Sequence, residues 1–328
     1  MSAAPSATLA AAPASARPTR SRSPVLPITI GAVLVIAAGF AVPAWLLTIL
    51  LFALFRAMVV LGLIVLLRAG LVSFGQALYF AVGAYAVGFL SRAGVNDALV
   101  RVLAGALAAG ALGLVLGFLL RRYRGIFFAM LSLAFSMILY GLLVKSESLG
   151  STDGFAIHAT TYAGYAPDRS SERFALLVLS SVVAWAGAIA VALYLRGTLG
   201  RLAEAVRDNE IRVEYLGASV AMAVHVKYVI AATLAGVGGA LAAMVIGHVD
   251  PAMAYWTNSG EFVFVMILSG SGSVFAPFLG ALVFELIHAV ATHYSPGAWR
   301  IILGSALLAA IMFVPGGLWS LMPKARRS

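Results

Sequence analysis

Long apolar segments, separated by short polar connectors, alternate along almost the whole chain. Crossing the hydrocarbon core of a bilayer as an α-helix takes roughly 20 predominantly apolar residues, which is about the length of these segments. We interpret ten segments as membrane-crossing helices, at 27–42, 44–67, 72–90, 99–120, 125–144, 174–195, 224–247, 254–268, 276–291 and 299–314. The pattern predicts an all-α fold: a polytopic transmembrane helical bundle of about ten spans, with short or broken helices among them.

Composition supports this class and excludes several others. The chain is 62% hydrophobic and 10% charged, whereas soluble domains are about 45–50% apolar and about 25% charged. It has no cysteine, which excludes disulfides and thiolate chemistry. It contains neither a Gly-x4-Gly-Lys-Ser/Thr phosphate loop nor a His-Glu-x-x-His metal motif. We therefore expect no enzyme activity, no catalytic residues, no metal site and no cofactor of its own.

Charge gives the expected orientation. The net charge is +10, and in a membrane protein such an excess indicates positive-inside topology rather than nucleic-acid binding. With the N-terminus inside, the cytoplasmic connectors hold most of the Lys and Arg, and an even number of spans places both basic termini in the cytoplasm. Residues 1–26 are rich in Ala, Ser and Pro, and we interpret them as a disordered cytoplasmic tail rather than a cleaved signal peptide. The transmembrane domain is then 27–318, with an outer loop at 145–173, and 319–328 is a basic cytoplasmic tail.

The connector Gly200–Val220 carries seven of the charged residues. No Pro or Gly interrupts it between Arg201 and Leu216, and apolar residues recur there at helical spacing, so we predict an amphipathic helix at about 201–217 that ends at a glycine. Three Arg stand against four acidic residues. Helices that lie on anionic lipid usually carry an excess of positive charge, so this near-neutral helix indicates a protein partner.

Three ionisable residues fall within predicted spans: Arg56, Glu261 and Glu285. A charge at the bilayer centre costs at least about 2.5–3.5 kcal/mol, which makes each one a candidate functional residue. Two interpretations remain open: ion pairs between helices, or side chains that face a polar cavity.

Two further stretches interrupt the apolar pattern, Arg68–Tyr85 and Ser269–Phe284. Each begins with a Gly/Ser-rich turn and then enters the membrane. Such interruptions in the two halves of a transporter indicate a transport pathway, and tight packing turns are the alternative. The polar loop holds Ser151–Gly154, which is either an ordinary turn or part of an outer mouth.

Together these segments resemble the permease subunits of bacterial ABC importers of the branched-chain amino acid type. The resemblance covers about 50–320 and rests on "AGLVSFGQALYFAVGAY", "RGIFFAMLSLAF", "GSTDGF", "GRLAEAVRDNEIRVEYLGASV", "ILSGSGSVFAPFLGALVF" and "VPGGLW". It implies a second permease subunit, two cytoplasmic ATP-binding subunits that bind the ATP, an extracytoplasmic solute-binding protein, and location in a bacterial inner membrane among lipid.

The resemblance also implies roles for particular residues. The helix at 201–217 would couple to an ATPase, and the residues that carry this likeness are Glu204, Ala205, Asp208, Asn209 and Gly217. The translocation pathway would include Ser73, Gly75, Gln76, Gly83, Tyr85, Phe128, Thr152, Asp153, Gly270 and Gly272.

Departures from the family pattern leave the substrate open. Gln76 stands where the family commonly has His, and Ser269 where it has Gly. Urea, amides and other small organic solutes are therefore alternatives to branched-chain amino acids. An ion-coupled secondary transporter that uses Arg56, Glu261 and Glu285 is the alternative class, and a membrane-embedded enzyme lacks a catalytic cluster.

Overall fold

The computed structural model describes residues 25–162, 164–168, 171–314 and 316–321. The α-helices are α1 (Val25–Ala41), α2 (Ala44–Leu67), α3 (Gln76–Arg92), α4 (Ala98–Leu120), α5 (Gly125–Lys145), α6 (Glu172–Arg196), α7 (Thr198–Asp208), α8 (Glu210–Tyr215), α9 (Val220–Ile246), α10 (Trp256–Ser269), α11 (Ala276–Tyr294) and α12 (Trp299–Phe313). Short 3₁₀ helices are η1 (Glu147–Leu149), η2 (Pro251–Ala254) and η3 (Leu318–Leu321), and β1 (Phe155–Ala156) pairs antiparallel with β2 (His248–Val249). Most of the two expected tails lies outside the described residues.

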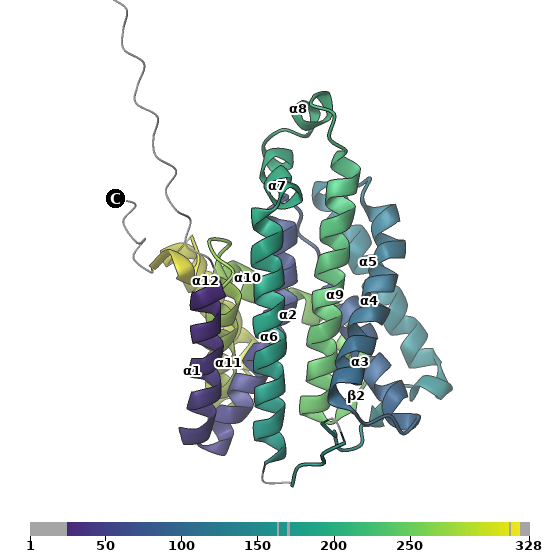
Figure 1. Cartoon of the computed structure of the whole chain (residues 1–328), viewed down its shortest axis with the longest axis vertical. Helices are drawn as coiled ribbons and strands as arrows, with labels where there is room; N and C mark the ends of the chain where they lie inside the picture. Colours follow the sequence, from purple (N-terminus) through teal and green to yellow (C-terminus); the bar gives the residue numbers. More distant parts are fainter. Residues whose placement is uncertain (1–24, 163, 169–170, 315, 322–328) are drawn as a thin grey trace, which may run out of the picture.

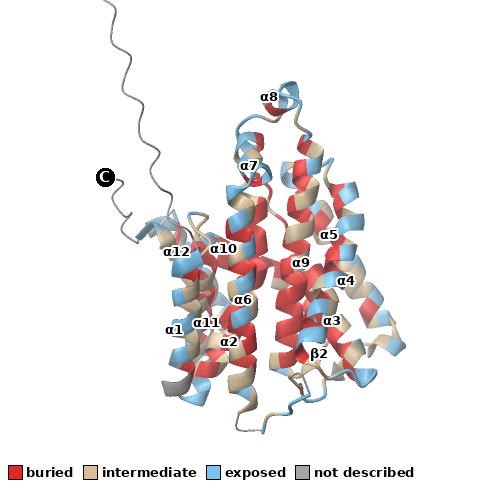
Figure 2. Ribbon diagram, viewed as in Figure 1, coloured by how far each residue is buried: buried red, intermediate tan, exposed pale blue. Residues whose placement is uncertain are grey.

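The bundle is organised around α2 and α9. Helix α9 contacts α2, α3 and α4 extensively, and α2 also contacts α6 and α11. Figure 1 shows α7 and α8 projecting beyond one end of the bundle and β2 at the other. Buried residues are concentrated along α2, α3 and α9 (Figure 2), whereas α4 and α5 expose apolar side chains such as Leu107 and Phe127. A surface of this kind suits contact with lipid rather than water.

All ten predicted apolar segments are helical, so the all-α fold is confirmed. Six of the described helices are long and apolar enough to cross a membrane: α2, α4, α5, α6, α9 and α11. The apolar helices α1 and α12 are shorter, α3 has 17 residues, and α10 has 14. The expected count of about ten spans is therefore not confirmed.

The segment between α2 and α3 is not helical. We predicted a span from 72, but α3 begins only at Gln76, and the preceding Ser73 is completely buried. Two backbone amides here donate to serine hydroxyl groups instead of to helical carbonyls. Phe74 N donates to Ser132 Oγ of α5 over 3.1 Å, and Ala77 N donates to Ser259 Oγ of α10 over 3.0 Å. Buried backbone groups need such partners away from water, so these two serines support a broken segment inside the bundle.

The charged connector forms two helices, not the single helix that we predicted at 201–217. Asn209 adopts an extended conformation (φ −164°, ψ 102°), and its side chain accepts a hydrogen bond from Arg212 N at the start of α8. Asparagine competes with helical backbone hydrogen bonds and favours N-caps. The apolar spacing that we interpreted as one helix therefore continues across a break.

Arg101 is a buried charge that the sequence analysis did not single out. It lies in the first turn of α4 and is completely buried. Its guanidinium donates to Val95 O over 3.1 Å, to His158 O over 3.2 Å and to Thr160 Oγ1 over 3.2 Å. These bonds compensate for the burial of the charge and attach the polar loop 145–173 to the bundle.

Small residues bring α3, α4 and α9 into close contact. A Cβ on Gly83 would collide with the Gly236 backbone, and one on Gly239 would collide with the Phe80 carbonyl. Backbones approach this closely only where side chains are absent, which explains the glycines of "AGVGGAL" in α9.

We expect Gly239→Ala to destabilise the bundle, because the new methyl group meets the α3 backbone, and overpacking of this kind costs about 1–3 kcal/mol. The control is Gly141→Ala in α5, where nothing lies within 4 Å of the new Cβ and alanine favours helix. The midpoint of thermal unfolding of the detergent-solubilised protein should fall for the first variant and not for the second. Equal midpoints for Gly239→Ala and the unmodified protein would contradict this packing.

Candidate functional site

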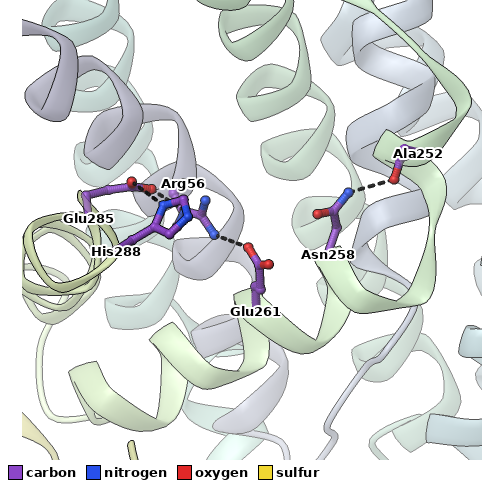
Figure 3. A network of polar contacts seen from close by, with 6 residues as sticks. All are labelled: Arg56, Ala252, Asn258, Glu261, Glu285 and His288. Atoms are coloured by element: carbon purple, nitrogen blue, oxygen red, sulfur yellow. Dashed lines mark hydrogen bonds and ion pairs between the residues drawn. The ribbon is translucent and has the colours of Figure 1, made fainter. Parts of the chain in front are cut away.

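Three helices bring the intramembrane charges together. Arg56 of α2 donates from Nε to Glu285 Oε1 of α11 over 2.6 Å and from Nη1 to Glu261 Oε2 of α10 over 2.9 Å (Figure 3). His288, one turn after Glu285, lies with Nδ1 3.7 Å from Glu285 Oε2. The interpretation as ion pairs between helices is therefore correct. Such pairing lowers the cost of holding charge away from water.

Arg56, Glu285 and His288 of this cluster also line a cavity, but its walls are mostly apolar and Glu261 is not among its lining residues. The cavity has a volume of about 320 Å³. Phenyl rings surround the charge: the Arg56 guanidinium carbon lies 4.6 Å from the ring centre of Phe284 and 5.8 Å from that of Phe262. The lining residues are Phe52, Phe55, Arg56, Phe80, Ile246, His248, Asp250, Ala252, Met253, Asn258, Phe262, Glu285 and His288. Mostly apolar walls with a few polar groups are typical of small-molecule sites.

The connection between α9 and α10 and the first turn of α10 supply other polar groups of the cavity. Asp250 accepts a hydrogen bond from Met253 N over 3.2 Å, and Asn258 donates from Nδ2 to Ala252 O over 2.7 Å. Strand β2 in the same connection bonds to the polar loop, because His248 Nε2 lies 3.0 Å from Asp153 O. Thr152 and Asp153 are exposed at this end, so the turn that we associated with an outer mouth lies next to the cavity lining.

Other predicted pathway residues form a buried group at the start of α3. Ser73, Gln76 and Phe128 are completely buried, and a Cβ on Gly75 would collide with the Ser132 backbone of α5. Both amide atoms of Gln76 lack a hydrogen-bond partner in the described part of the chain. Gln76 and the cavity residue Phe80 are four residues apart in one helix, hence on the same face one turn apart. This group therefore lies one helical turn beyond the cavity lining.

The remaining predicted pathway residues lie elsewhere. Gly83 is in the contact between α3 and α9. Tyr85 packs edge-on against Phe155 of β1, with ring centres 5.7 Å apart, and lines a separate cavity. Gly270 (φ 78°) abuts the Gly316 carbonyl, and Gly272 abuts Trp319. Sequence reasoning grouped these glycines with the pathway, but the structure places them against the C-terminal turn.

The predicted coupling residues lie at the opposite end of the bundle, on α7, on α8 and between them (Figure 1). Ala205, Asp208, Asn209 and Gly217 are exposed. Glu204 is in α7, but its side chain is not described. Val206 and Val213 face the core, as the apolar spacing indicated, whereas Leu216 is 81% exposed.

Sequence reasoning missed an exposed apolar group on α8. Ile211 is 67% exposed and Tyr215 is 88% exposed. The two residues are four positions apart and so share one face of the helix, and Leu216, which follows the last residue of α8, is exposed next to them. Their spacing was visible in the sequence, but the buried stripe of Val206 and Val213 masked the signal.

Sequence reasoning also missed Asp250, Asn258 and His288, which line the cavity. His288 follows Glu285 at helical spacing, which was a usable signal. Asp250 and Asn258 flank a connection whose path only tertiary structure determines.

Loss of Arg56 should be more damaging than neutralising the whole cluster. Arg56→Gln leaves two carboxylates without their cation, which for a buried pair costs about 3–5 kcal/mol. The triple variant Arg56→Gln, Glu261→Gln, Glu285→Gln removes the uncompensated charge, and we expect it to recover most of the folded yield and thermal stability. A single variant as stable as the unmodified protein would refute the compensating role of Arg56.

Comparison with known proteins agrees with this architecture. The family model "Branched-chain amino acid transport system / permease component" matches residues 45–314. The high-affinity branched-chain amino acid transport system permease protein LivM of Escherichia coli (strain K12) is 27% identical over 286 residues, which cover 79% of this chain and 67% of LivM. The permease protein LivH of the same organism is 21% identical over 265 residues, covering 76% of this chain and 85% of LivH.

The LivM protein of Salmonella typhimurium gives a similar result, 28% identity over 290 residues. No solved structure matches the chain. The family match extends from the start of α2 to the end of α12 and so includes the charged cavity and the α7–α8 segment. The chain therefore belongs to the permease family of branched-chain amino acid ABC transport systems.

Proposed function

We propose that this protein is the permease subunit of an ABC importer in a bacterial inner membrane and forms the translocation pathway for branched-chain or related amino acids. In this proposal α7 and α8 lie in the cytoplasm, with both chain termini on that side, and couple the pathway to a separate ATPase. The β1–β2 end then faces outside. Family membership and the printed names of the relatives support the substrate class.

The observation that carries the coupling role is the exposed apolar face of α8. Ile211 and Tyr215 of α8 and the following Leu216 are exposed, and α8 lies beyond the end of the bundle (Figure 1). Exposed clusters of large apolar residues with a polar rim are typical of protein interfaces. The near balance of charge on the segment also favours a protein over anionic lipid.

Helices α7 and α8 each contact a connector between two membrane helices. Glu210 forms an ion pair with Arg124 of the α4–α5 connector, with Nε and Oε1 2.7 Å apart. On α7, Arg207 packs beside Gly70, the turn that leads into the broken segment before α3. A force on these helices therefore reaches the segment that holds Ser73 and Gln76.

The remaining partners follow from the same proposal. Two cytoplasmic ATP-binding subunits supply the energy, a second permease subunit completes the pathway, and an extracytoplasmic binding protein delivers the solute. The relatives carry two permease names, LivM and LivH, which favours a pair of related permeases.

Uptake by the reconstituted complex tests the function. We expect leucine uptake into proteoliposomes to require the ATP-binding subunits and ATP, because the permease has no phosphate loop of its own. Uptake by the permease without those subunits, driven by a proton gradient, would instead identify a secondary transporter that uses Arg56 and the two glutamates.

The α8 face provides a second test. Ile211→Asp with Tyr215→Asp places two charges on the proposed interface, and we expect co-purification of the ATP-binding subunits to fall about tenfold or more. Membrane insertion should be unchanged, since both side chains are exposed. The control is Tyr165→Asp, an exposed tyrosine in the outer loop (66% exposed), which should leave co-purification intact. Normal association of the double variant would remove α8 as the contact.

A further inference from the structure

We infer that the cavity beside Arg56 is a binding site for one zwitterionic amino acid with an apolar side chain. This inference rests on the proposed function and names what the pathway recognises inside the membrane. It assigns the carboxylate of the solute to Arg56, its ammonium group to Asp250 and Asn258, and its side chain to the surrounding phenyl rings.

Arg56 retains a donor for a carboxylate. Nε and Nη1 are used by the two glutamates, while Nη2 has no partner in the described part of the chain (Figure 3). The ion pairs fix the plane of the guanidinium on two sides, and a preorganised donor loses little freedom when it binds. Arg56 can therefore hold the glutamates and a bound carboxylate at the same time.

Two acceptors, one in the α9–α10 connection and one in the first turn of α10, suit an ammonium group. Asn258 must direct Nδ2 toward the Ala252 carbonyl to make its 2.7 Å bond, so its Oδ1 points the other way, toward the side where Arg56 and His288 lie (Figure 3). Asp250 uses one carboxylate oxygen for Met253 N, and its other oxygen accepts no bond from a described residue. An ammonium group offers three donors and no acceptor, which matches these free oxygens.

The rest of the wall suits an aliphatic side chain. Phe55 and Phe80 have ring centres 6.1 Å apart, and Phe80 and Phe262 have ring centres 5.2 Å apart, so one continuous aromatic surface extends over α2, α3 and α10. The cavity volume of about 320 Å³ lies at the low end of ligand pockets, about 300–1,000 Å³. A small solute fits such a space, and a peptide does not.

The charges also discriminate between the substrate classes that the sequence left open. Asp250 and Glu285 stand against Arg56 in the lining, so the cavity disfavours a solute with negative charge only. A neutral amide such as urea would leave the aromatic wall without a partner. A zwitterion with an aliphatic group satisfies the carboxylate donor, the ammonium acceptors and the apolar wall together.

Binding to the unmodified complex tests the assignment of groups without any risk of misfolding. The permease complex with its ATP-binding subunits, in lipid nanodiscs and without the binding protein, is titrated with radiolabelled leucine. Competitors are isoamylamine, which lacks the carboxylate, 4-methylpentanoate, which lacks the ammonium group, and urea. We expect unlabelled leucine to compete at least about tenfold better than either single-charge analogue and urea not to compete, since a charged hydrogen bond contributes about 1.5–3 kcal/mol. Equal competition by 4-methylpentanoate would overturn the ammonium site.

The variant Asp250→Asn tests the role of the Asp250 carboxylate as the acceptor for the ammonium group. Asparagine can still cap the following turn, so the fold should persist while the negative charge is lost. We expect leucine binding to weaken about tenfold or more, with little change in binding of 4-methylpentanoate. The matched control is Asp97→Asn, an aspartate that caps α4 by accepting from Leu99 N and Val100 N and does not line the cavity; it should bind leucine normally.

ATP-driven leucine uptake, measured in parallel, separates this inference from the proposed function. If the unmodified complex transports leucine and Asp250→Asn binds and transports it equally well, the cavity assignment is wrong and the permease function stands. If the unmodified complex transports no leucine under ATP, the proposed function fails first and the assignment fails with it.

Discussion

The ion pairs of Arg56 are the interaction on which this part of the molecule depends. They join α2, α10 and α11 at a depth where apolar helices surround them. Apart from Arg56, α2 is almost fully apolar, and dispersion forces alone do not fix how such a helix is rotated or offset against its neighbours. A cation shared by two carboxylates fixes both, because any rotation of one helix leaves a charge unpaired.

A second constraint comes from the backbone between α2 and α3. A non-helical segment inside a membrane bundle requires external hydrogen-bond partners, and Ser132 and Ser259 provide them from α5 and α10. The broken segment therefore depends on two helices that follow much later in the chain. It also leaves Gln76 buried, with no described residue as a hydrogen-bond partner for its amide, one helical turn from the aromatic lining of the cavity.

The positions of the apolar helices and the residues of the charged cluster could be predicted from the sequence. The contacts between those helices could not. Apolar length located every one of the ten segments, since the bilayer sets that length physically. Arg56, Glu261 and Glu285 stood out because charge in an apolar span is costly, yet nothing in their spacing showed that all three converge. Asp250 lies in a connection whose path depends on β1 pairing with β2, and Asn258 lies in the first turn of the helix that follows it. The break at Asn209 was hidden because apolar periodicity continued through it.

That break has a mechanical consequence. A continuous helix transmits a push along its axis and resists bending, since every turn is hydrogen-bonded to the next. At Asn209 the chain is extended, so α8 can change its angle to α7 by rotation about one residue, without loss of the helical bonds within α7. In the proposed importer, the non-helical residue between the two helices lets α8 follow the rotation of a bound ATPase, while α7 transmits only a displacement to the turn at Gly70.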